Sequence, residues 1–239
     1  MKKTGIVIRS LIFMVFFYSY TLLWGVACVA AFFGTAKAAN WVPRSWAHMN
    51  RWTLRWICGI RVEIKGLENL PRQDGYIVAS KHESAMETVL FHMMVPNGIY
   101  VLKKVLLWIP VAGWYFFKTG SIAIDRKAGT AAMRDLLEKS KARLKDGFNI
   151  MIFPEGTRMK PRAPTHYNPG VALIYDECRV PVVPVALNTG YFWPKNSFWR
   201  YPGVCTFEFL PPIEPGLPRR AFLAELEKRI ETASAALTP

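Results

Sequence analysis

Apolar and polar positions divide the chain into an uncharged amino-terminal segment and a longer region of short alternating elements. The segment from Ser10 to Phe33 contains no charged residue. A helix of that length measures about 36 Å and can cross a hydrocarbon core about 30 Å thick. A cleaved signal peptide is the alternative, supported by the AKA sequence at Ala36 to Ala38, but the apolar stretch is longer than the usual core of such a peptide. The pattern therefore favours a membrane helix.

Positive charge lies on both sides of this segment, which bears on how it meets the membrane. The cationic residues are Lys2, Lys3 and Arg9 before it and Lys37, Arg44, Arg51 and Arg55 after it. Because cationic flanks usually stay on the cytoplasmic side, a helix that enters one leaflet and returns explains both flanks, and a single crossing is the alternative. The following stretch, Trp41 to Ile60, mixes tryptophans with arginines, which is typical of an amphipathic helix lying at the membrane interface.

From Ile60 onward the periodicity becomes that of an α/β domain. Strands are predicted at 61–66, 75–80, 97–104, 120–125, from 148 and at 180–187, and helices at 84–95, 130–146 and from 218. Their order predicts a mixed, partly parallel sheet flanked by helices. Pro181 and Pro184 place the strand 180–187 near a sheet edge, because proline cannot donate to a ladder. The chain thus divides into membrane-anchoring helices in 1–60 and an α/β domain in 61–239.

The charge balance indicates an anionic partner. The formal net charge is +14, and hydrophobic residues make up 51% of the chain. Nucleic acid, anionic lipid headgroups and phosphorylated substrates all attract such a protein. Nucleic acid fits least, because the basic residues accompany apolar and tryptophan-rich stretches. The composition therefore favours a lipid surface or a phosphorylated small molecule, with no nucleic acid.

The cysteines argue against a disulfide framework or a metal site. They are Cys28, Cys58, Cys178 and Cys205, with no CxxC spacing and no histidine at ligand spacing. This pattern fits a reducing cytosolic setting. The chain also lacks a P-loop, a dinucleotide-type glycine motif and a GxSxG elbow.

The stretch KHESAMETVLF, Lys81 to Phe91, allows two interpretations. Five helical residues turn by about 500°, so His82 and Glu87 meet only if His82 precedes the helix and Glu87 faces back from its first turn. In that case the two side chains form a histidine–acid pair. Alternatively, Ser84 and Glu87 form the S-x-x-E capping box of a helix, which gives Glu87 a structural role.

Other predicted strand ends supply further polar residues. FPEGTR, Phe153 to Arg158, follows an apolar strand, and its glycine and arginine suit a turn that faces an anion. Arg126 ends the strand 120–125, and Lys103 and Lys104 end the strand 97–104. Because sites in open α/β sheets usually lie at strand ends, we expect these residues to gather around His82.

Four blocks in this order, KHESAMET, GSIAIDR, FPEGTR and VPVVPVAL, resemble the motifs of the glycerolipid acyltransferase superfamily. The resemblance is greatest to the bacterial 1-acyl-sn-glycerol-3-phosphate acyltransferases and runs from about residue 60 to about residue 215. The family usually has Asp at the position of Glu87. That difference keeps the carboxylate but changes its reach.

The resemblance implies transfer of a fatty acyl group from a thioester to the free hydroxyl of lysophosphatidate, forming phosphatidate. It implies that His82 is the general base and that Glu87 orients it, as the acid does in a Ser-His-Asp triad. Ser84 as a covalent nucleophile is the alternative. The substrate-binding residues implied are Arg126, Glu155, Gly156, Thr157 and Arg158, with Lys103 and Lys104 as further candidates. No metal and no cofactor are expected, and the acyl donor is acyl-CoA or acyl carrier protein.

Two other functions compete with this one. The same chemistry could act on another lysolipid, such as an aminoacyl lysolipid, or the chain could be a non-catalytic scaffold whose basic face binds anionic membranes. Each version places the protein at a membrane, on its cytoplasmic face, which is the inner membrane if the source is bacterial.

Overall fold

The structure, a computed structural model, describes residues 3–239 and contains a seven-stranded sheet with helices on both faces. The strands are β1 (Ile60–Lys65), β2 (Ile77–Ser80), β3 (Gly98–Lys103), β4 (Ile122–Ile124), β5 (Asn149–Ile152), β6 (Val182–Leu187) and β7 (Gly203–Phe209). The α-helices are α1 (Lys3–Ala27), α2 (Ala36–Ala39), α3 (Trp41–Thr53), α4 (Met86–Met94), α5 (Ala112–Lys118), α6 (Thr130–Lys145), α7 (Gly170–Cys178), α8 (Thr189–Phe192) and α9 (Arg219–Ala236). Shorter helical turns are η1 (Val29–Phe33), η2 (Leu54–Cys58), η3 (Leu67–Asn69), η4 (Lys104–Trp108) and η5 (Arg126–Ala128).

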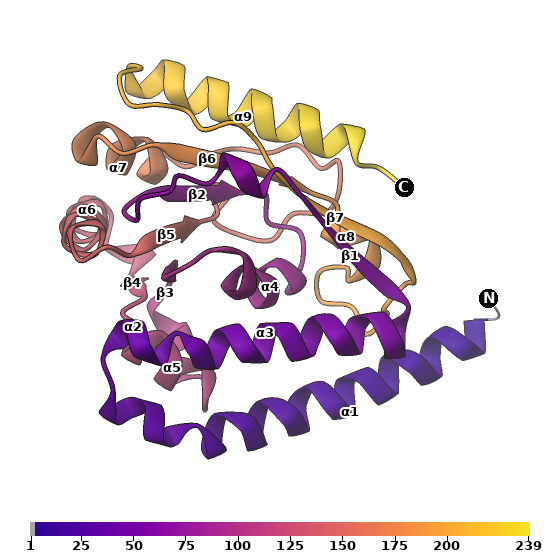
Figure 1. The fold of residues 1–239 in the computed structure, drawn as a ribbon. Helices are drawn as coiled ribbons and strands as arrows, with labels where there is room; N and C mark the ends of the chain where they lie inside the picture. Colours follow the sequence, from indigo (N-terminus) through magenta and orange to yellow (C-terminus); the bar gives the residue numbers. More distant parts are fainter. Residues whose placement is uncertain (1–2) are drawn as a thin grey trace.

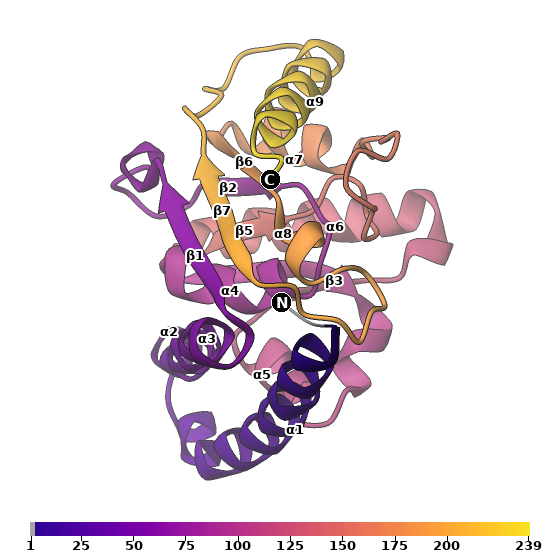
Figure 2. The same cartoon turned by 90° about the vertical axis from the view of Figure 1, so that its right-hand side faces the viewer.

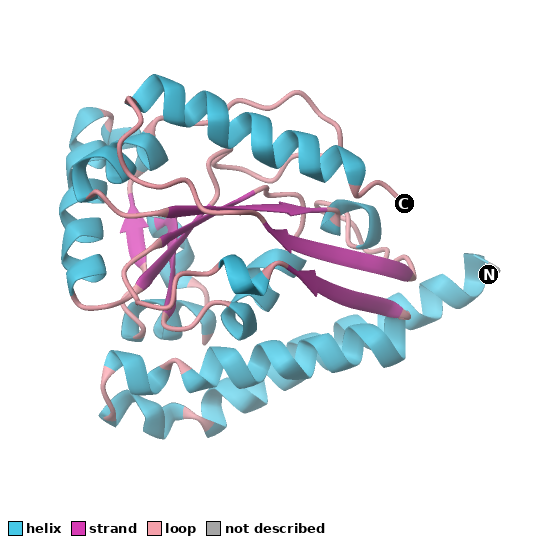
Figure 3. Ribbon diagram, turned by 45° about the horizontal axis from the view of Figure 1, so that its top comes forward, coloured by secondary structure: helices cyan, strands magenta, loops and turns pink. Residues whose placement is uncertain are grey.

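The sheet is mixed, as the sequence predicts. Its order is β1-β7-β6-β2-β5-β3-β4, and neighbouring strands are parallel except β6 and β7, which are antiparallel. Figure 1 shows the strands between α9 and α7 above and α4 and α3 below. Figure 3 shows the same layering, with the strands enclosed by helices. The predicted α/β class, with helices on both faces, is confirmed.

The prediction that β6 lies at a sheet edge is wrong, because β6 lies between β2 and β7. The carbonyls of Pro181 and Val185 accept hydrogen bonds from the β2 side at 3.1 and 3.3 Å. Pro184 faces the opposite side, where its carbonyl accepts from the Leu210 N–H at 2.9 Å. Leu210 follows β7, and the pairing of β6 with β7 begins only at Val185. Pro184 has no N–H to donate, but it lies where β7 has ended and the hydrogen-bonded pairing of β6 with β7 stops. An interior strand therefore tolerates this proline.

Both faces of the central strands are buried, which explains their nearly continuous apolar sequences. In β2, Val78 belongs to the core under α4 and η2, whereas Ile77 and Ala79 belong to the core under α6, α7 and α9. Successive side chains of a strand point to opposite faces, so one short segment supports both cores. The position of β2 in the sheet is fixed from both sides.

The amino-terminal helices form an antiparallel pair that packs against the α/β part. α1 and α3 lie side by side along one flank, as Figures 1 and 2 show. Phe13 of α1 is fully buried and packs edge-on against Trp193 with ring centroids 5.4 Å apart. The helix expected from Ser10 begins earlier, at Lys3, and ends at Ala27, after which η1 forms a tighter turn. Phe13 belongs to the same hydrophobic core as residues of β1. The division of the chain into two parts at residue 60 stays a prediction.

The strands β2, β5, β3 and β4 are adjacent and parallel, so their carboxyl ends meet at one edge of the sheet. β2 leads into Lys81, β5 into Phe153 and β4 into Asp125. This edge brings the polar residues of separate motifs together, as the rule for open α/β sheets predicts.

Candidate active site

His82 and Glu87 form a hydrogen-bonded pair at the carboxyl end of β2. His82 lies on the turn between β2 and α4, and Glu87 lies in the first turn of α4. The distance from His82 Nδ1 to Glu87 Oε1 is 2.8 Å. The two side chains meet because the histidine precedes the helix, as the sequence requires for this pair.

The same carboxylate also bonds to the backbone just before α4, as the Glu87 half of the predicted capping box does, so the two interpretations of Glu87 are compatible. Glu87 Oε1 accepts the backbone N–H groups of Glu83 at 2.8 Å and Ser84 at 2.6 Å, and Ser84 Oγ accepts the Met86 N–H at 3.0 Å. These bonds satisfy donors that a helix start leaves free. Glu87 is fully buried, and the amides hold its carboxylate in place for His82.

The imidazole of His82 is held on its face and through its backbone. Its ring stacks on Phe153 with centroids 4.1 Å apart, and its carbonyl accepts the Met159 N–H at 2.7 Å. With Glu87 on Nδ1, a neutral ring carries its proton on that nitrogen and presents Nε2 as the acceptor. The side chain is 13% exposed, so the imidazole is partly open to solvent. The arrangement suits a general base.

Glu155 is buried beneath His82 and bonds to groups of the protein itself. Its Oε2 accepts the His82 N–H at 2.6 Å, and its Oε1 lies 3.7 Å from Lys81 Nζ. Burial raises the pKa of this carboxyl to about 7, against the opposing effects of Lys81 and of the His82 amide. The structure therefore places Glu155 as a support of the His82 backbone.

A second buried acid, Glu83, lies beside the pair. Its Oε2 accepts the Gly190 N–H at 3.0 Å. Burial raises the pKa of Glu83 to about 8, and nearby Glu87 contributes in the same direction. A carboxyl with this pKa holds a proton at neutral pH that it would lose in water.

The turn of the FPEGTR motif lies next to Arg126. Gly156 has a φ of +69°, and a Cβ there would lie 3.0 Å from the Arg126 guanidinium, so the turn needs glycine. Arg126 Nη1 donates to the Gly156 carbonyl. Arg158 Nε is buried and has no hydrogen-bond partner among residues 3–239. A buried guanidinium donor without an acceptor fits a site for an anion.

The remaining predicted substrate-binding residues are exposed. Thr157 lies in the same turn, and Lys103 and Lys104 lie where β3 passes into η4. The structure places these lysines at the same sheet edge as His82. No contact within the described part of the chain joins either lysine to the His82–Glu87 pair.

One cavity borders this edge of the sheet, and a second lies beside α4. One, of about 220 Å³, is lined by Arg126, Gly156 and Asn168 together with apolar residues of β4, β5 and α6. The other, of about 120 Å³, lies between the amino-terminal helices and α4 and α5, with Trp24, Thr88 and Tyr115 among its lining residues, and its walls are mainly apolar. One cavity thus presents a guanidinium and the other presents hydrocarbon.

Sequence reasoning missed Thr189, whose hydroxyl donates to Glu87 Oε2 at 2.7 Å. Thr189 follows β6, the neighbour of β2, so the strand-end rule could have identified it if β6 had been placed inside the sheet. Lys81 and Glu231 were also missed, because their pairing joins distant segments. No group of three or more His, Cys, Asp and Glu side chains within the described residues is arranged to hold a metal ion.

Comparisons with known proteins identify a family and several relatives. A family model described as acyltransferase matches residues 61–188. A 1-acyl-sn-glycerol-3-phosphate acyltransferase of Pseudomonas aeruginosa is 30% identical over 226 residues, which cover 94% of this chain and 88% of that protein. The enzyme of the same name from Cocos nucifera is 30% identical over 171 residues, covering 71% of this chain and 55% of its own length.

A solved structure has the same fold. It is the 1-acyl-sn-glycerophosphate acyltransferase PlsC of Thermotoga maritima, with a TM-score of 0.83 and 23% sequence identity. The superposition covers 99% of this chain and 98% of that one, so it includes the amino-terminal helices.

Proposed function

The chain belongs to the acyltransferase family, and we propose that it transfers a fatty acyl group from a thioester to the free hydroxyl of lysophosphatidate, forming phosphatidate. The names of the relatives supply the substrate class. The observation that carries the proposal is the His82–Glu87 pair at 2.8 Å, with an imidazole that is partly exposed.

In the proposed reaction His82 Nε2 takes the proton of the lysophosphatidate hydroxyl as its oxygen attacks the thioester carbonyl. A new C–O bond forms, the carbonyl electrons move to oxygen, and the C–S bond breaks as the intermediate collapses. The leaving thiolate takes this proton from the imidazolium, and Glu87 stabilises the imidazolium until then. Direct attack makes a protein nucleophile unnecessary. Ser84 suits that role poorly, because it is buried and its oxygen caps α4.

The phosphate of the acceptor is proposed to bind at the FPEGTR turn. Arg126 lines the cavity of about 220 Å³, and Arg158 carries a buried Nε without an acceptor in residues 3–239. Guanidinium groups suit phosphate because their planar donors match its oxygens. Lys103, Lys104, Gly156 and Thr157 stay candidates for the same subsite. The acyl donor is proposed to be acyl-CoA or acyl carrier protein, with no cofactor and no metal.

The protein is proposed to act on the cytoplasmic face of a membrane with its helix pair in one leaflet. α1 is the described helix that is long and apolar enough to cross a membrane. α5 packs against its carboxyl end, where the Tyr115 hydroxyl donates to the Gly25 carbonyl at 2.9 Å. The side chains of Trp108 and Phe117 beside it are 83% and 77% exposed. This apolar segment follows β3, so the membrane-facing surface adjoins the edge that holds the site.

Flotation with anionic vesicles tests the membrane contact. Replacing Trp108 and Phe117 by Ser should reduce the bound fraction, while Leu217→Ser, an exposed apolar residue elsewhere, should not. To distinguish insertion from a single crossing, a Lys3→Cys variant is labelled with an impermeant reagent in sealed vesicles, because a single crossing puts residue 3 and the domain on opposite sides. Labelling from the side opposite the domain would show a crossing and contradict insertion into one leaflet.

A matrix of acceptors and donors tests the reaction. Purified protein in mixed micelles is given lysophosphatidate or an aminoacyl lysolipid, each with acyl-CoA or acyl carrier protein. We expect phosphatidate with at least one donor and its loss in His82→Ala. Turnover of a phosphate-free lysolipid in preference to lysophosphatidate would select the alternative acceptor, and no product with any pair would favour a scaffold.

A further inference from the structure

A buried lysine lies directly behind the candidate base. Lys81 is 2% exposed and immediately precedes His82. Its Nζ lies 2.5 Å from Glu231 Oε2 and 3.7 Å from Glu155 Oε1. An ammonium group in the interior is stable only when anions compensate it, so these carboxylates determine where the Lys81 side chain lies.

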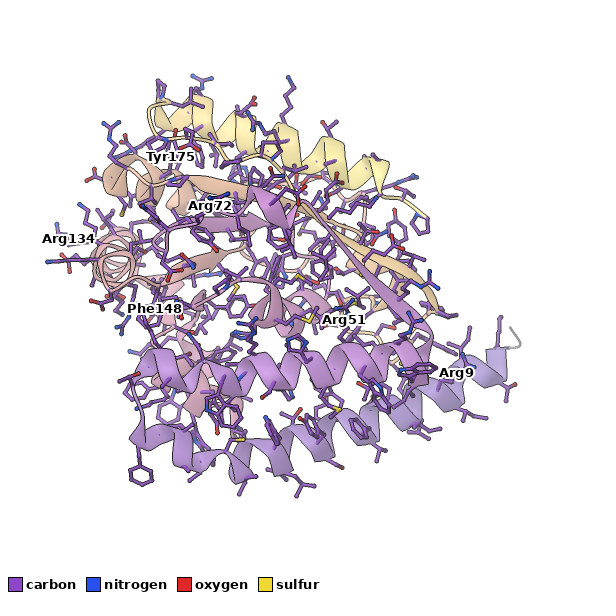
Figure 4. The ribbon with its side chains drawn as sticks, in the orientation of Figure 1. Arg9, Arg51, Arg72, Arg134, Phe148 and Tyr175 are labelled. Atoms are coloured by element: carbon purple, nitrogen blue, oxygen red, sulfur yellow. The ribbon has the colours of Figure 1, made fainter. Side chains whose placement is uncertain are left out.

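Glu231 comes from α9, at the far end of the chain. Its Oε1 accepts the Tyr167 hydroxyl at 3.0 Å, so both carboxylate oxygens are occupied. α9 itself is fixed to the domain. Tyr175 of α7, labelled in Figure 4, stacks on Phe222 of α9 with ring centroids 3.8 Å apart. Glu231 is therefore presented to Lys81 from a rigid element.

These contacts form a continuous path to His82. Glu231 holds Lys81, Lys81 faces Glu155, and Glu155 Oε2 accepts the His82 N–H at 2.6 Å. We propose that Glu231 and Lys81 are positioning residues, through which α9 sets the backbone of His82 by way of Glu155. This inference rests on the proposed function. It assigns a role to the C-terminal helix, which lies outside the matched family domain of residues 61–188.

The two contacts of Lys81 compete, which explains why Glu231 affects His82. Because Glu231 draws the ammonium group to 2.5 Å, Lys81 stays at 3.7 Å from Glu155 and leaves Oε2 to the His82 amide. Without the Glu231 charge, Glu155 becomes the remaining anion beside Lys81. The ammonium then moves toward Glu155 and draws the carboxylate away from the amide. A displacement of about 1 Å at a reacting group can cost about 100-fold in rate.

Several charged groups face Glu155 and enter the pH dependence. Lys81 and the His82 amide face it from the end of β2, Glu231 from α9 and Glu87 from α4, and Glu83 and Tyr167 also interact with its charge. Lys81 lowers the pKa of Glu155, whereas Glu231 and Glu87 raise it. Removing the lysine charge should therefore leave Glu155 protonated to higher pH and weaken its hold on the His82 N–H.

The test compares Glu231→Gln with Glu225→Gln on the same helix. Glu225 pairs with Arg229 at 2.7 Å, so the control also removes one ion pair and one negative charge from α9. Each protein is assayed for kcat and KM with lysophosphatidate and the preferred donor. We expect Glu231→Gln to lower kcat about 10- to 100-fold with both KM values nearly unchanged. Glu225→Gln should match the wild type.

A readout independent of turnover accompanies the kinetics. Hydrogen exchange of the peptide that contains the His82 amide should be faster in Glu231→Gln than in the wild type and in Glu225→Gln. Equal exchange together with equal kcat would overturn the proposal. A wild type without any acyltransfer would instead refute the proposed function, and the exchange result would still decide the positioning role.

Lys81 provides the second variant pair. Lys81→Arg keeps the charge, and we expect its pH–kcat profile to resemble that of the wild type. In Lys81→Met the acid limb of that profile should move to higher pH by about 1 unit or more. The reason is that a positive charge close to a carboxyl lowers its pKa by about that amount, and this variant removes the charge beside Glu155. Equal profiles of Lys81→Met and Lys81→Arg would contradict the role of the lysine charge.

Discussion

The Thr189 hydroxyl donates to Glu87 Oε2 at 2.7 Å, although the two residues are 102 positions apart in the sequence. Glu87 Oε1 meanwhile accepts from the His82 ring and from two backbone amides. The acid is therefore oriented by contacts with both the turn before α4 and the first residue of α8.

Removing the base should abolish turnover without unfolding the protein. His82→Ala should lower kcat by about 10²- to 10⁴-fold, the usual contribution of general-base catalysis. Because His82 is partly exposed, the variant should keep its circular dichroism spectrum and its binding to vesicles. Unchanged turnover in this variant would contradict the assignment of His82.

The contact between Thr189 and Glu87 should matter for catalysis. Thr189→Val keeps the shape but removes the hydroxyl, leaving one buried carboxylate oxygen without its donor, a loss of about 1–3 kcal/mol. We expect a lower kcat and a lower Tm, and nearly full recovery in Thr189→Ser. If Thr189→Ser is as impaired as Thr189→Val, the hydroxyl is not the important group.

The arginines at the FPEGTR turn should affect acceptor binding. Arg126→Gln and Arg158→Gln should each raise KM for lysophosphatidate about 10-fold or more and leave KM for the acyl donor nearly unchanged, because a charge-assisted hydrogen bond contributes about 1.5–3 kcal/mol. Arg134→Gln serves as the control, since Figure 4 shows that side chain pointing away from the domain on α6. Equal effects on both substrates would place the phosphate elsewhere.

Glu83 should make the protein less stable as pH rises. Burial raises its pKa from 4.5 to about 8, so between these values the folded state holds a proton that the unfolded chain has lost. This stabilisation disappears as pH rises through about 8. Glu83→Gln has no proton to lose, so its Tm relative to the wild type should increase between pH 5 and pH 9, by at least about 2–4 °C.

The control for this measurement is Glu138→Gln on the exposed face of α6. Surface substitutions usually change stability by less than about 0.5 kcal/mol, so its Tm should stay close to that of the wild type at both pH values. A Tm difference for Glu83→Gln that is the same at pH 5 and pH 9 would show that Glu83 does not hold a proton in the fold.

The sequence by itself determined the elements and the local half of the site. Apolar periodicity located six of the seven strands and the helix from residue 218, because burial of one face imposes a period on the chain, but it missed β7, α5 and α7. The turn from β2 to α4 was predictable as well, since His82, Ser84 and Glu87 are close in sequence and their hydrogen bonds are local. The motif order further indicated the family.

The tertiary structure decided which distant residues complete the site. It placed β6 inside the sheet, brought Thr189 to Glu87, and set Glu231 of α9 against Lys81. It also directed Glu155 toward the His82 amide instead of toward open solvent. Such contacts depend on how the sheet and helices pack, and no local periodicity encodes a pairing between segments 73 or more residues apart.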